Sequence, residues 1–229
     1  MRNSSSTLLF HLDQDRFGPD QPTKVSADVA NLAGDYTYLT SGYYASLDAE
    51  LAGLRVLPTT AEALDAYVVP LAMAKASRAG LLVPEHEIIT DRFPAAPLMA
   101  YPINPFSSKG ELLLDVAAIE ARRKGLTYTG KYAVLVQHLP LDYRLDTLRL
   151  VLGRTLIPEY EEVAGQLFEL FRLPLMKVRM IVSTRSYQLS AIEPLPFSEL
   201  SEEERGELAA LGKWQGNAEQ WPGNQMVRG

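Results

Sequence analysis

The stretch DYTYLTSGYYASLDAELAGLRVLP, residues 35–58, decides the fold class of this chain. It begins as an aromatic, polar loop and ends as a strand that Pro58 stops. Between the two, apolar side chains recur at helical spacing, and Gly53 is a natural place for that helix to end. The stretch therefore predicts a loop, a short helix and a strand. The predicted apolar face of the helix consists of Tyr44, Leu47, Leu51 and Leu54.

Short helices and strands alternate through the rest of the chain. Apolar and polar side chains alternate within residues 176–182 and again within residues 187–191. A link of only four residues joins the two segments, which predicts an antiparallel hairpin. Capping boxes at Ser108/Glu111 and Ser201/Glu204 predict helix starts. We therefore expect an α/β fold, a three-layer mixed sheet with flanking helices and a late antiparallel hairpin. The expected helices cover 60–67, 71–79, 111–124, a segment starting at 158, and 201–214, and the remaining expected strands cover 8–11, 25–32, 87–90, 98–101, 132–137 and 147–152.

The expected organisation is one domain with less regular ends. Residues 1–24 are a polar lead-in, residues 25–214 form a single α/β domain, and residues 215–229 resemble a frayed tail. The region at about 67–144 is an extended middle, rich in prolines that interrupt its strands.

The composition is that of an ordinary globular protein. Of the 229 residues, 47% are hydrophobic and 22% charged, and no apolar run approaches the roughly 20 residues of a membrane-spanning helix. The absence of cysteine excludes disulfides and thiolate chemistry and fits a cytoplasmic protein. A net charge of −6 argues against a broad nucleic-acid surface. We therefore expect neither a nucleic-acid nor a membrane partner.

Two blocks of the sequence resemble the RimK-like ATP-grasp N-terminal domain family. The first block begins at Asn31-Leu32 and includes Ser41-Gly42-Tyr43-Tyr44, and the second begins at Thr147-Leu148-Arg149-Leu150 and continues through Gly153-Arg154. Their order matches the family pattern, and they cover somewhat under half of the chain. Further matching positions are Tyr36, Tyr38, Ser46-Leu47, Glu50, Gly53, Pro58, Gln166-Leu167-Phe168, Phe171, Pro174-Leu175, Ile192, Pro194 and Glu199-Leu200.

The resemblance implies a module that usually precedes an ATP-grasp ligase domain. Such ligases join a carboxylate to an amine through an acyl-phosphate, with ATP and Mg²⁺. The module's implied part is substrate recognition or domain packing. The chain departs from the family pattern by stopping shortly after the module and by carrying its extended middle.

Two groups of residues are candidates for ligand binding. The rings of Tyr36, Tyr38 and Tyr43 offer contact area and their hydroxyls offer orientation, while Gly42 permits either a tight turn into the helix or close approach of a ligand. Arg154, just after a strand, either clamps a carboxylate or phosphate or pairs with Glu159 or Glu161.

A nucleotide site is the alternative, in the segment Phe106-Ser107-Ser108-Lys109-Gly110. Lys109 and Gly110 would grip phosphates there, although the same residues are equally explained as a helix N-cap. The sequence contains no Glu-x-Asn or Asp-x-Asn pair to clamp Mg²⁺. The compact cluster Glu85-His86-Glu87 could bind a metal, but neighbours in sequence usually point to different sides of an extended chain, and the three histidines follow no metal-ligand spacing. We therefore predict no metal site and no catalytic residue.

The leading hypothesis is an accessory or substrate-recognition module that acts with an ATP-grasp carboxylate–amine ligase in peptide or amino-acid modification. It needs no cofactor of its own, and a small carboxylate or amine is its expected ligand. Two alternatives remain open. One is a compact, divergent ATP-grasp-like ligase that binds ATP and Mg²⁺, and the other is a stand-alone small-molecule binding protein.

Overall fold

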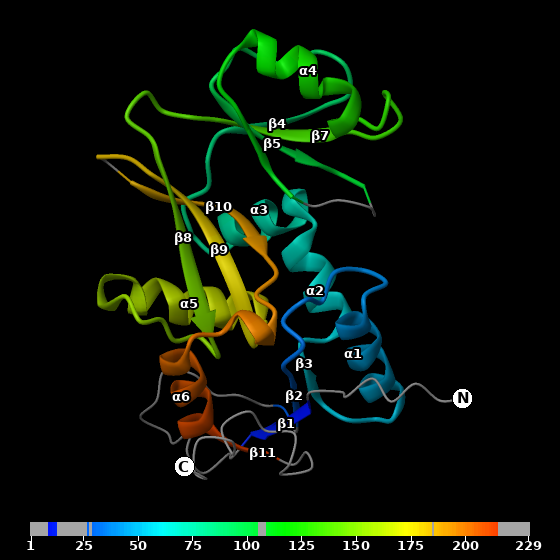
Figure 1. The fold of residues 1–229 in the computed structure, drawn as a ribbon, viewed down its shortest axis with the longest axis vertical. Coiled ribbons are helices and arrows are strands. Elements are labelled where there is room, and N and C mark those ends of the chain that lie inside the picture. The colour runs from blue at the N-terminus through cyan, green and yellow to red at the C-terminus, as the bar shows by residue number, and fades with distance from the viewer. Residues whose placement is uncertain (1–8, 13–26, 28, 105–108, 185, 215–229) are drawn as a thin grey trace. The chain divides into compact units, whose positions relative to one another are not determined.

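The chain folds into two compact units, each assembled from separate stretches of sequence (Figure 1). This computed structural model describes residues 9–12, 27, 29–104, 109–184 and 186–214. Unit 1 comprises residues 1–63, 149–176 and 194–229, and unit 2 comprises residues 64–148 and 177–193. The predicted division into residues 1–24, 25–214 and 215–229 stays a prediction, and the tail 215–229 lies outside the described residues.

Unit 1 carries a four-stranded sheet in the order β11-β1-β2-β3, in which β2 and β3 are parallel. Its other pairs, β1 with β2 and β1 with β11, are antiparallel. The elements of this unit are β1 (Leu9–Leu12), β2 (Val29–Asn31), α1 (Ser41–Leu51), β3 (Val56–Leu57), the 3₁₀ turn η2 (Pro158–Tyr160), α5 (Glu161–Phe171), the 3₁₀ turn η3 (Phe197–Glu199), α6 (Glu202–Leu211) and β11 (Gly212–Trp214).

Helix α1 packs on β2 and β3 through small side chains, contrary to the predicted apolar face. Ala49 joins Val29 and Val56 in a buried cluster, and Gly42 and Ser46 are the other buried residues of the helix. Tyr44 is 47% exposed and Leu51 is 79% exposed. The prediction that Tyr44 and Leu51 lie on the buried face of the helix was therefore wrong. Small residues bring the helix axis closer to the sheet than a row of leucines would allow.

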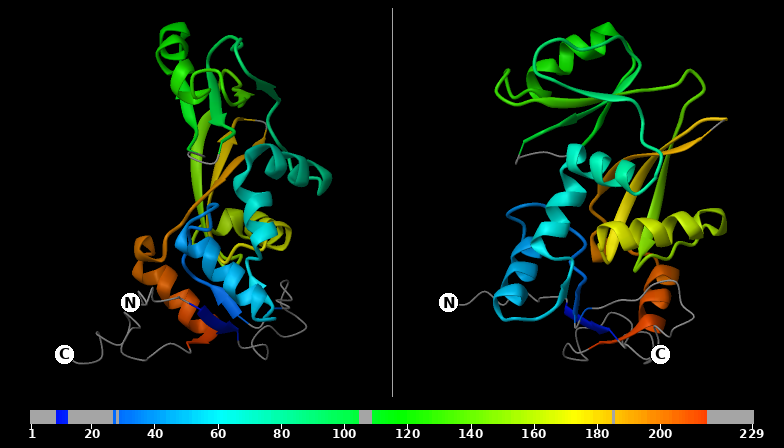
Figure 2. Two further views of the ribbon diagram at one scale, coloured as in Figure 1. Left: turned by 90° about the vertical axis from the view of Figure 1, so that its right-hand side faces the viewer. Right: turned by 180° about the vertical axis from the view of Figure 1, so that it is seen from behind.

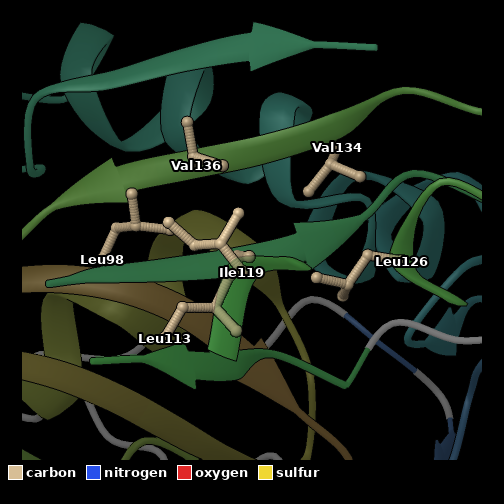
Figure 3. Packing of buried hydrophobic residues seen from close by; sticks show 7 residues of the cluster. Leu98, Leu113, Ile119, Leu126, Val134 and Val136 are labelled. Atoms are coloured by element: carbon tan, nitrogen blue, oxygen red, sulfur yellow. The ribbon is translucent and has the colours of Figure 1, made fainter. Parts of the chain in front are cut away.

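Unit 2 contains the antiparallel sheet β4-β7-β5-β6. Helix α4 buries Ile119 and Leu126 against this sheet (Figure 3), and the two turned views show the helix on one side of it (Figure 2). The sheet residues of the same cluster are Leu98, Ala100, Leu113, Val134 and Val136. The elements of this unit are α3 (Val69–Arg78), β4 (His86–Ile89), β5 (Leu98–Pro102), β6 (Glu111–Leu113), α4 (Val116–Leu126), β7 (Val134–His138) and β10 (Tyr187–Glu193).

Three elements run across the unit boundaries: α2 (Thr60–Tyr67), β8 (Arg144–Val151) and β9 (Leu175–Val182). Strands β10, β9 and β8 form the third sheet, and β9 pairs with β10 in antiparallel register. The predicted hairpin and the mixed α/β class are therefore confirmed, with the strands distributed over three sheets. Among the described residues, no helix is long and apolar enough to cross a bilayer.

The start of the predicted helix 111–124 was wrong. Glu111 opens strand β6, and the helix begins at Val116 with the Asp115 carboxylate accepting the Ala118 N–H. Ser108 lies outside the described residues. The last predicted helix is confirmed at its start by the Ser201/Glu204 capping box, but it ends at Leu211 because β11 takes residues 212–214.

A buried polar network holds β5, β7 and β10 together in unit 2. The Ser190 hydroxyl lies 2.7 Å from Tyr101 Oη and 2.6 Å from Gln137 Oε1, and all three side chains are buried. Gln137 Nε2 donates to the Ser190 carbonyl. Burial raises the pKa of Tyr101 to about 12, although the hydrogen bond with Ser190 opposes that rise. Tyr101 is therefore a neutral member of this network at physiological pH.

Replacing Ser190 by alanine is expected to lower the free energy of unfolding by about 2 kcal/mol, because buried groups on Tyr101 and Gln137 lose their partner. Urea denaturation of the variant measures the loss. Ser77→Ala, at an exposed position of α3, is the matched control and should stay within about 0.5 kcal/mol. Adding Tyr101→Phe to Ser190→Ala should cost less than the sum of the single losses, and strict additivity would contradict this account.

Candidate functional site

A tight turn at the end of β8 sets the position of Arg154. Leu152 and Gly153 both have positive φ, 48° and 82°, as the two central residues of a type I′ turn require. Val151 and Arg154 exchange two backbone hydrogen bonds of 2.9 and 3.0 Å across the turn. A Cβ on Gly153 would lie 2.9 Å from Cβ of Phe168, so the turn sits directly on helix α5. The turn and its contact with α5 therefore hold the backbone of Arg154 in place.

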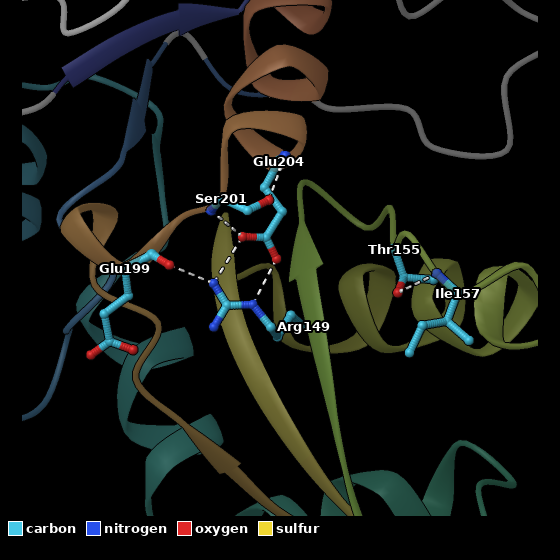
Figure 4. A network of polar contacts seen from close by, with 6 residues as sticks. All are labelled: Arg149, Thr155, Ile157, Glu199, Ser201 and Glu204. Atoms are coloured by element: carbon cyan, nitrogen blue, oxygen red, sulfur yellow. Dashed lines mark hydrogen bonds and ion pairs between the residues drawn. The ribbon is translucent and has the colours of Figure 1, made fainter.

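Arg149, five residues before Arg154, forms a bidentate ion pair with Glu204 of α6. Its Nε and Nη2 donate to the two Glu204 carboxylate oxygens at 2.7 and 2.8 Å, and Nη2 also donates to the Glu199 carbonyl (Figure 4). The Ser201 backbone N–H adds a bond to Glu204 at 2.8 Å. The Glu204 side chain is only 6% exposed. Glu204 is therefore a buried member of the ion pair as well as the helix cap that the sequence predicted.

The pKa values of this pair move in opposite directions. Burial by itself would raise the pKa of Glu204, but hydrogen bonds from Arg149 and from the Ser201 backbone outweigh it and lower the pKa overall. The hydrogen bond to Glu204 raises the pKa of Arg149 despite partial burial. Both groups therefore stay charged at neutral pH and hold the start of α6 against β8.

Arg154 makes a looser ion pair on the same helix. Its Nη1 donates to Glu207 Oε2 at 3.1 Å, and the two side chains are 44% and 41% exposed. The pairing expected with Glu159 or Glu161 was wrong, because Glu161 instead accepts the Thr155 backbone N–H. Together with Arg149 and Glu204, this pair borders a small, partly open pocket with a water-accessible volume of about 10 Å³, whose remaining lining residues are Val151, Thr155 and Leu156.

The aromatic segment lies elsewhere in unit 1, and the pocket lining includes none of its tyrosines. Tyr36 is buried, and its hydroxyl donates to the Asn31 carbonyl at 2.6 Å. Burial raises the pKa of the Tyr36 phenol well above its usual range. Tyr36 therefore contributes to the core and orients the loop between β2 and α1.

Tyr38 and Tyr43 remain accessible at the start of α1. Their rings meet edge to face with centroids 5.3 Å apart, and Tyr38 is 47% exposed. Gly42 is buried, and its carbonyl accepts a hydrogen bond from Asn31 Nδ2 at 2.7 Å. A Cβ on Gly42 would lie 2.0 Å from the Asp35 carbonyl oxygen. Of the two roles considered for Gly42, the structure shows the tight turn into the helix.

The nucleotide alternative falls in unit 2. Lys109 is exposed, and Gly110 is buried where a Cβ would lie 2.2 Å from the Tyr101 ring. The helix N-cap explanation of these residues was wrong, because they lead into strand β6. The described part of the chain holds no group of three or more metal-ligating side chains. Within the cluster at 85–87, His86 Nδ1 contacts the Pro84 carbonyl and Glu87 contacts His138.

Sequence reasoning singled out Arg154 but missed Arg149, Glu204 and Glu207 as members of one pocket. The signals were partial: Arg149 belongs to the second family block, and Glu204 was identified only as a helix cap. Glu204 and Glu207 are three residues apart, which places both on one face of α6. The arrangement presents two cations and two anions around a small apolar patch.

The family model of the RimK-like ATPgrasp N-terminal domain matches residues 18–86 and 126–210. A search of curated proteins gives no match.

Similar solved structures share the fold at low sequence identity. A RimK domain protein ATP-grasp from Sphaerobacter thermophilus has a TM-score of 0.52 and 14% identity, over 72% of each chain. D-alanine–D-alanine ligase from Bacillus anthracis complexed with ATP has a TM-score of 0.54 and 10% identity, over 72% of this chain and 69% of the ligase. The ATP-grasp ligase PsnB complexed with minimal precursor, Mg and ADP has a TM-score of 0.51 and 14% identity, over 74% of this chain and 66% of PsnB.

Proposed function

The chain belongs to the RimK-like ATPgrasp N-terminal domain family, and from this premise we propose that it is an accessory, substrate-recognition module for an ATP-grasp carboxylate–amine ligase. The ligase would lie on another chain or in another domain. The natural setting is peptide or amino-acid modification in the cytoplasm. The proposed contribution of this module is to hold one substrate, a small carboxylate or amine.

The observation that carries this proposal is where the family match falls. The matched segment 18–86 contains the accessible tyrosines, and the matched segment 126–210 contains all four charged residues of the pocket. The surface features capable of recognition therefore belong to the family module. A guanidinium that keeps free N–H donors at the rim of a pocket is suited to a carboxylate.

Co-purification tests the proposed partnership. The full chain, tagged and purified from its native host, should elute with a stoichiometric ATP-grasp ligase that mass spectrometry identifies. A solitary chain that also fails to associate with the ATP-grasp ligases of the same host would overturn the accessory role. That outcome would shift support to a stand-alone small-molecule binding protein.

The ligand-binding residues are proposed to be Arg154 at the pocket and Tyr38 and Tyr43 at the start of α1. Tyr36 and Gly42 would act by shaping the loop that carries those rings. Arg154→Ala and Tyr38→Ala each remove a half-exposed side chain, so the fold should persist. If neither substitution alters the response to a carboxylate or amine ligand, the assignment of these residues is wrong.

A divergent ligase that binds ATP and Mg²⁺ is the second candidate, and the fold likeness to ATP-grasp ligases favours it. Lys109→Ala separates the two candidates. Under the accessory proposal we expect Mg²⁺-ATP titrations, followed by calorimetry, to be the same for Lys109→Ala and wild type. Lys124→Ala, which removes an exposed lysine from the last turn of α4, is the control. Nucleotide binding by wild type that Lys109→Ala alone abolishes would establish the ligase alternative.

A further inference from the structure

We propose that the chain forms a two-fold dimer in which β6 of one copy pairs antiparallel with β6 of a second copy. The pairing places Leu112 opposite Leu112 of the second copy and joins their two sheets into one continuous sheet. The surface involved is the outer edge of β6 with the residues on either side of it, residues 109–115. This self-association is distinct from the proposed partnership with a ligase.

Strand β6 is the last strand of its sheet. In the order β4-β7-β5-β6, β5 pairs with one side of β6, and no strand among the described residues pairs with its other side. Such an edge presents backbone N–H and C=O groups with which a strand of another chain can pair. Charged side chains commonly protect these edges, and the opposite edge carries Glu87 within β4 and Glu85 just before it. The centre of β6 is a leucine instead.

The leucines of this edge offer more apolar surface than the core of the unit uses. Leu113 is buried in the cluster beneath α4 (Figure 3), whereas its neighbour Leu112 points to the other face of the sheet. Leu112 is 37% exposed and Leu114 is 58% exposed. A second strand beside β6 would remove part of this apolar surface from water, which favours association.

The sequence around β6 is complementary to itself when two copies pair antiparallel about Leu112. In that register Lys109 lies opposite Asp115 of the second copy. Both side chains are exposed, and the Asp115 backbone is extended, with φ −152° and ψ 175°. Leu114 lies opposite Gly110, which has no side chain to collide with it. The two-fold axis repeats these contacts, so two opposite-charge pairs flank an apolar centre. A shift of one residue in either direction places Lys109 and Asp115 opposite uncharged residues.

Cysteine cross-linking of the full chain tests both the dimer and its register. The chain has no cysteine of its own, so one substitution gives one thiol per copy. In Leu112→Cys, the two Cα atoms at position 112 should lie about 4.5–5.5 Å apart, a separation that a disulfide spans. In Leu114→Cys, four residue positions separate the two Cα atoms along the strands, about 14 Å, which is too far.

Mild oxidation followed by non-reducing electrophoresis is the readout. Leu112→Cys should give at least about tenfold more cross-linked dimer than Leu114→Cys. Ile88→Cys, on the opposite edge of the sheet, is the control for random collisions, since Ile88 is 57% exposed. Equal cross-linking of the three variants, or none for Leu112→Cys, would overturn the proposal.

Sedimentation velocity of the cysteine-free chain measures the association directly. The mean sedimentation coefficient of wild type should rise with concentration, because a pairing of so few residues gives a reversible dimer. Lys109→Asp turns both opposite-charge pairs into like-charge pairs and should raise the dissociation constant at least about tenfold. Lys124→Asp, at an exposed position of α4, is the matched control. A wild-type chain that stays monomeric up to about 1 mM contradicts the dimer.

Co-purification with Leu112→Lys distinguishes a second copy from a ligase as the occupant of this edge. A lysine at the two-fold axis meets the same charge on the second copy, so the variant should be monomeric. If the variant fails to dimerise but still elutes with a ligase that wild type binds, the dimer is supported and the ligase binds elsewhere. If the substitution releases the ligase while self-association is unchanged, the edge serves the ligase and the dimer proposal is wrong.

Discussion

Replacing Gly42 by alanine is expected to lower the free energy of unfolding by about 3 kcal/mol, at the upper end for overpacking. The new Cβ would lie 2.0 Å from the Asp35 carbonyl oxygen and 2.9 Å from Cβ of Ala33. The loop cannot move aside freely, because the Thr40 hydroxyl donates to carbonyls of that loop while accepting the Tyr43 N–H. Urea denaturation followed by circular dichroism measures the loss.

Gly165→Ala is the matched control for Gly42→Ala. Gly165 lies within α5, and nothing occupies the space that its Cβ would take. Alanine should therefore stabilise this helix, by up to about 1 kcal/mol, through its higher helix propensity. Opposite signs for the two substitutions would identify Gly42 as a packing requirement. A Gly42→Ala variant as stable as wild type would show that the loop from Asp35 to Thr40 yields, and would reopen the ligand role of Gly42.

Helix α1 shows what the spacing of apolar residues could and could not predict. The sequence located the helix between a loop and a strand, because helical spacing and Gly53 are local signals. The buried face was wrong because hydrophobicity favoured Tyr44 and Leu51 over Gly42, Ser46 and Ala49. Asn31, from β2, donates to both the Gly42 carbonyl and the Ser46 hydroxyl. That polar contact links residues 11 and 15 positions apart, which spacing within the helix cannot reveal.

The two predicted capping boxes show that a local signal does not always decide where a helix begins. Ser201 and Glu204 form theirs, and α6 follows. Glu111 instead pairs with Ala100 in the sheet, because β6 completes the edge beside β5. A capping box is a local preference of about 1 kcal/mol, and strand pairing with the rest of a sheet can override it.

The pocket was only partly predictable, because its ion pairs join residues that are far apart in the sequence. Arg154 follows a strand and a glycine, which are local features, and it was identified. Its partner Glu207 and the pair Arg149–Glu204 bridge more than 50 residues of sequence. A single sequence gives no signal for such pairing, and Glu204, in the first turn of α6, is already explained by the helix dipole. Only the fold brings β8 and α6 together within unit 1.

Replacing Arg149 by methionine is expected to lower the free energy of unfolding by about 2–3 kcal/mol at pH 7. Breaking a buried ion pair from one side costs about 3–5 kcal/mol, and the loss is reduced here because Arg149 is one-third exposed. The cost arises because Glu204 stays 6% exposed without its principal partner. Arg144→Met, at an exposed arginine of the same strand, should change stability by at most about 0.5 kcal/mol.

The pH dependence separates this ion pair from a simple loss of packing. Because the folded-state pKa of Glu204 is lowered, its contribution is present above the ordinary glutamate value of 4.5 and is lost as pH falls through the folded-state value. The deficit of Arg149→Met relative to wild type should therefore shrink below about pH 4.5, where a protonated Glu204 no longer needs a cation. Glu204→Gln should show a flatter acid limb than wild type, measured by urea midpoints between pH 3 and 7. A deficit that is constant over this range would mean that Arg149 stabilises α6 through the contacts of its aliphatic stem.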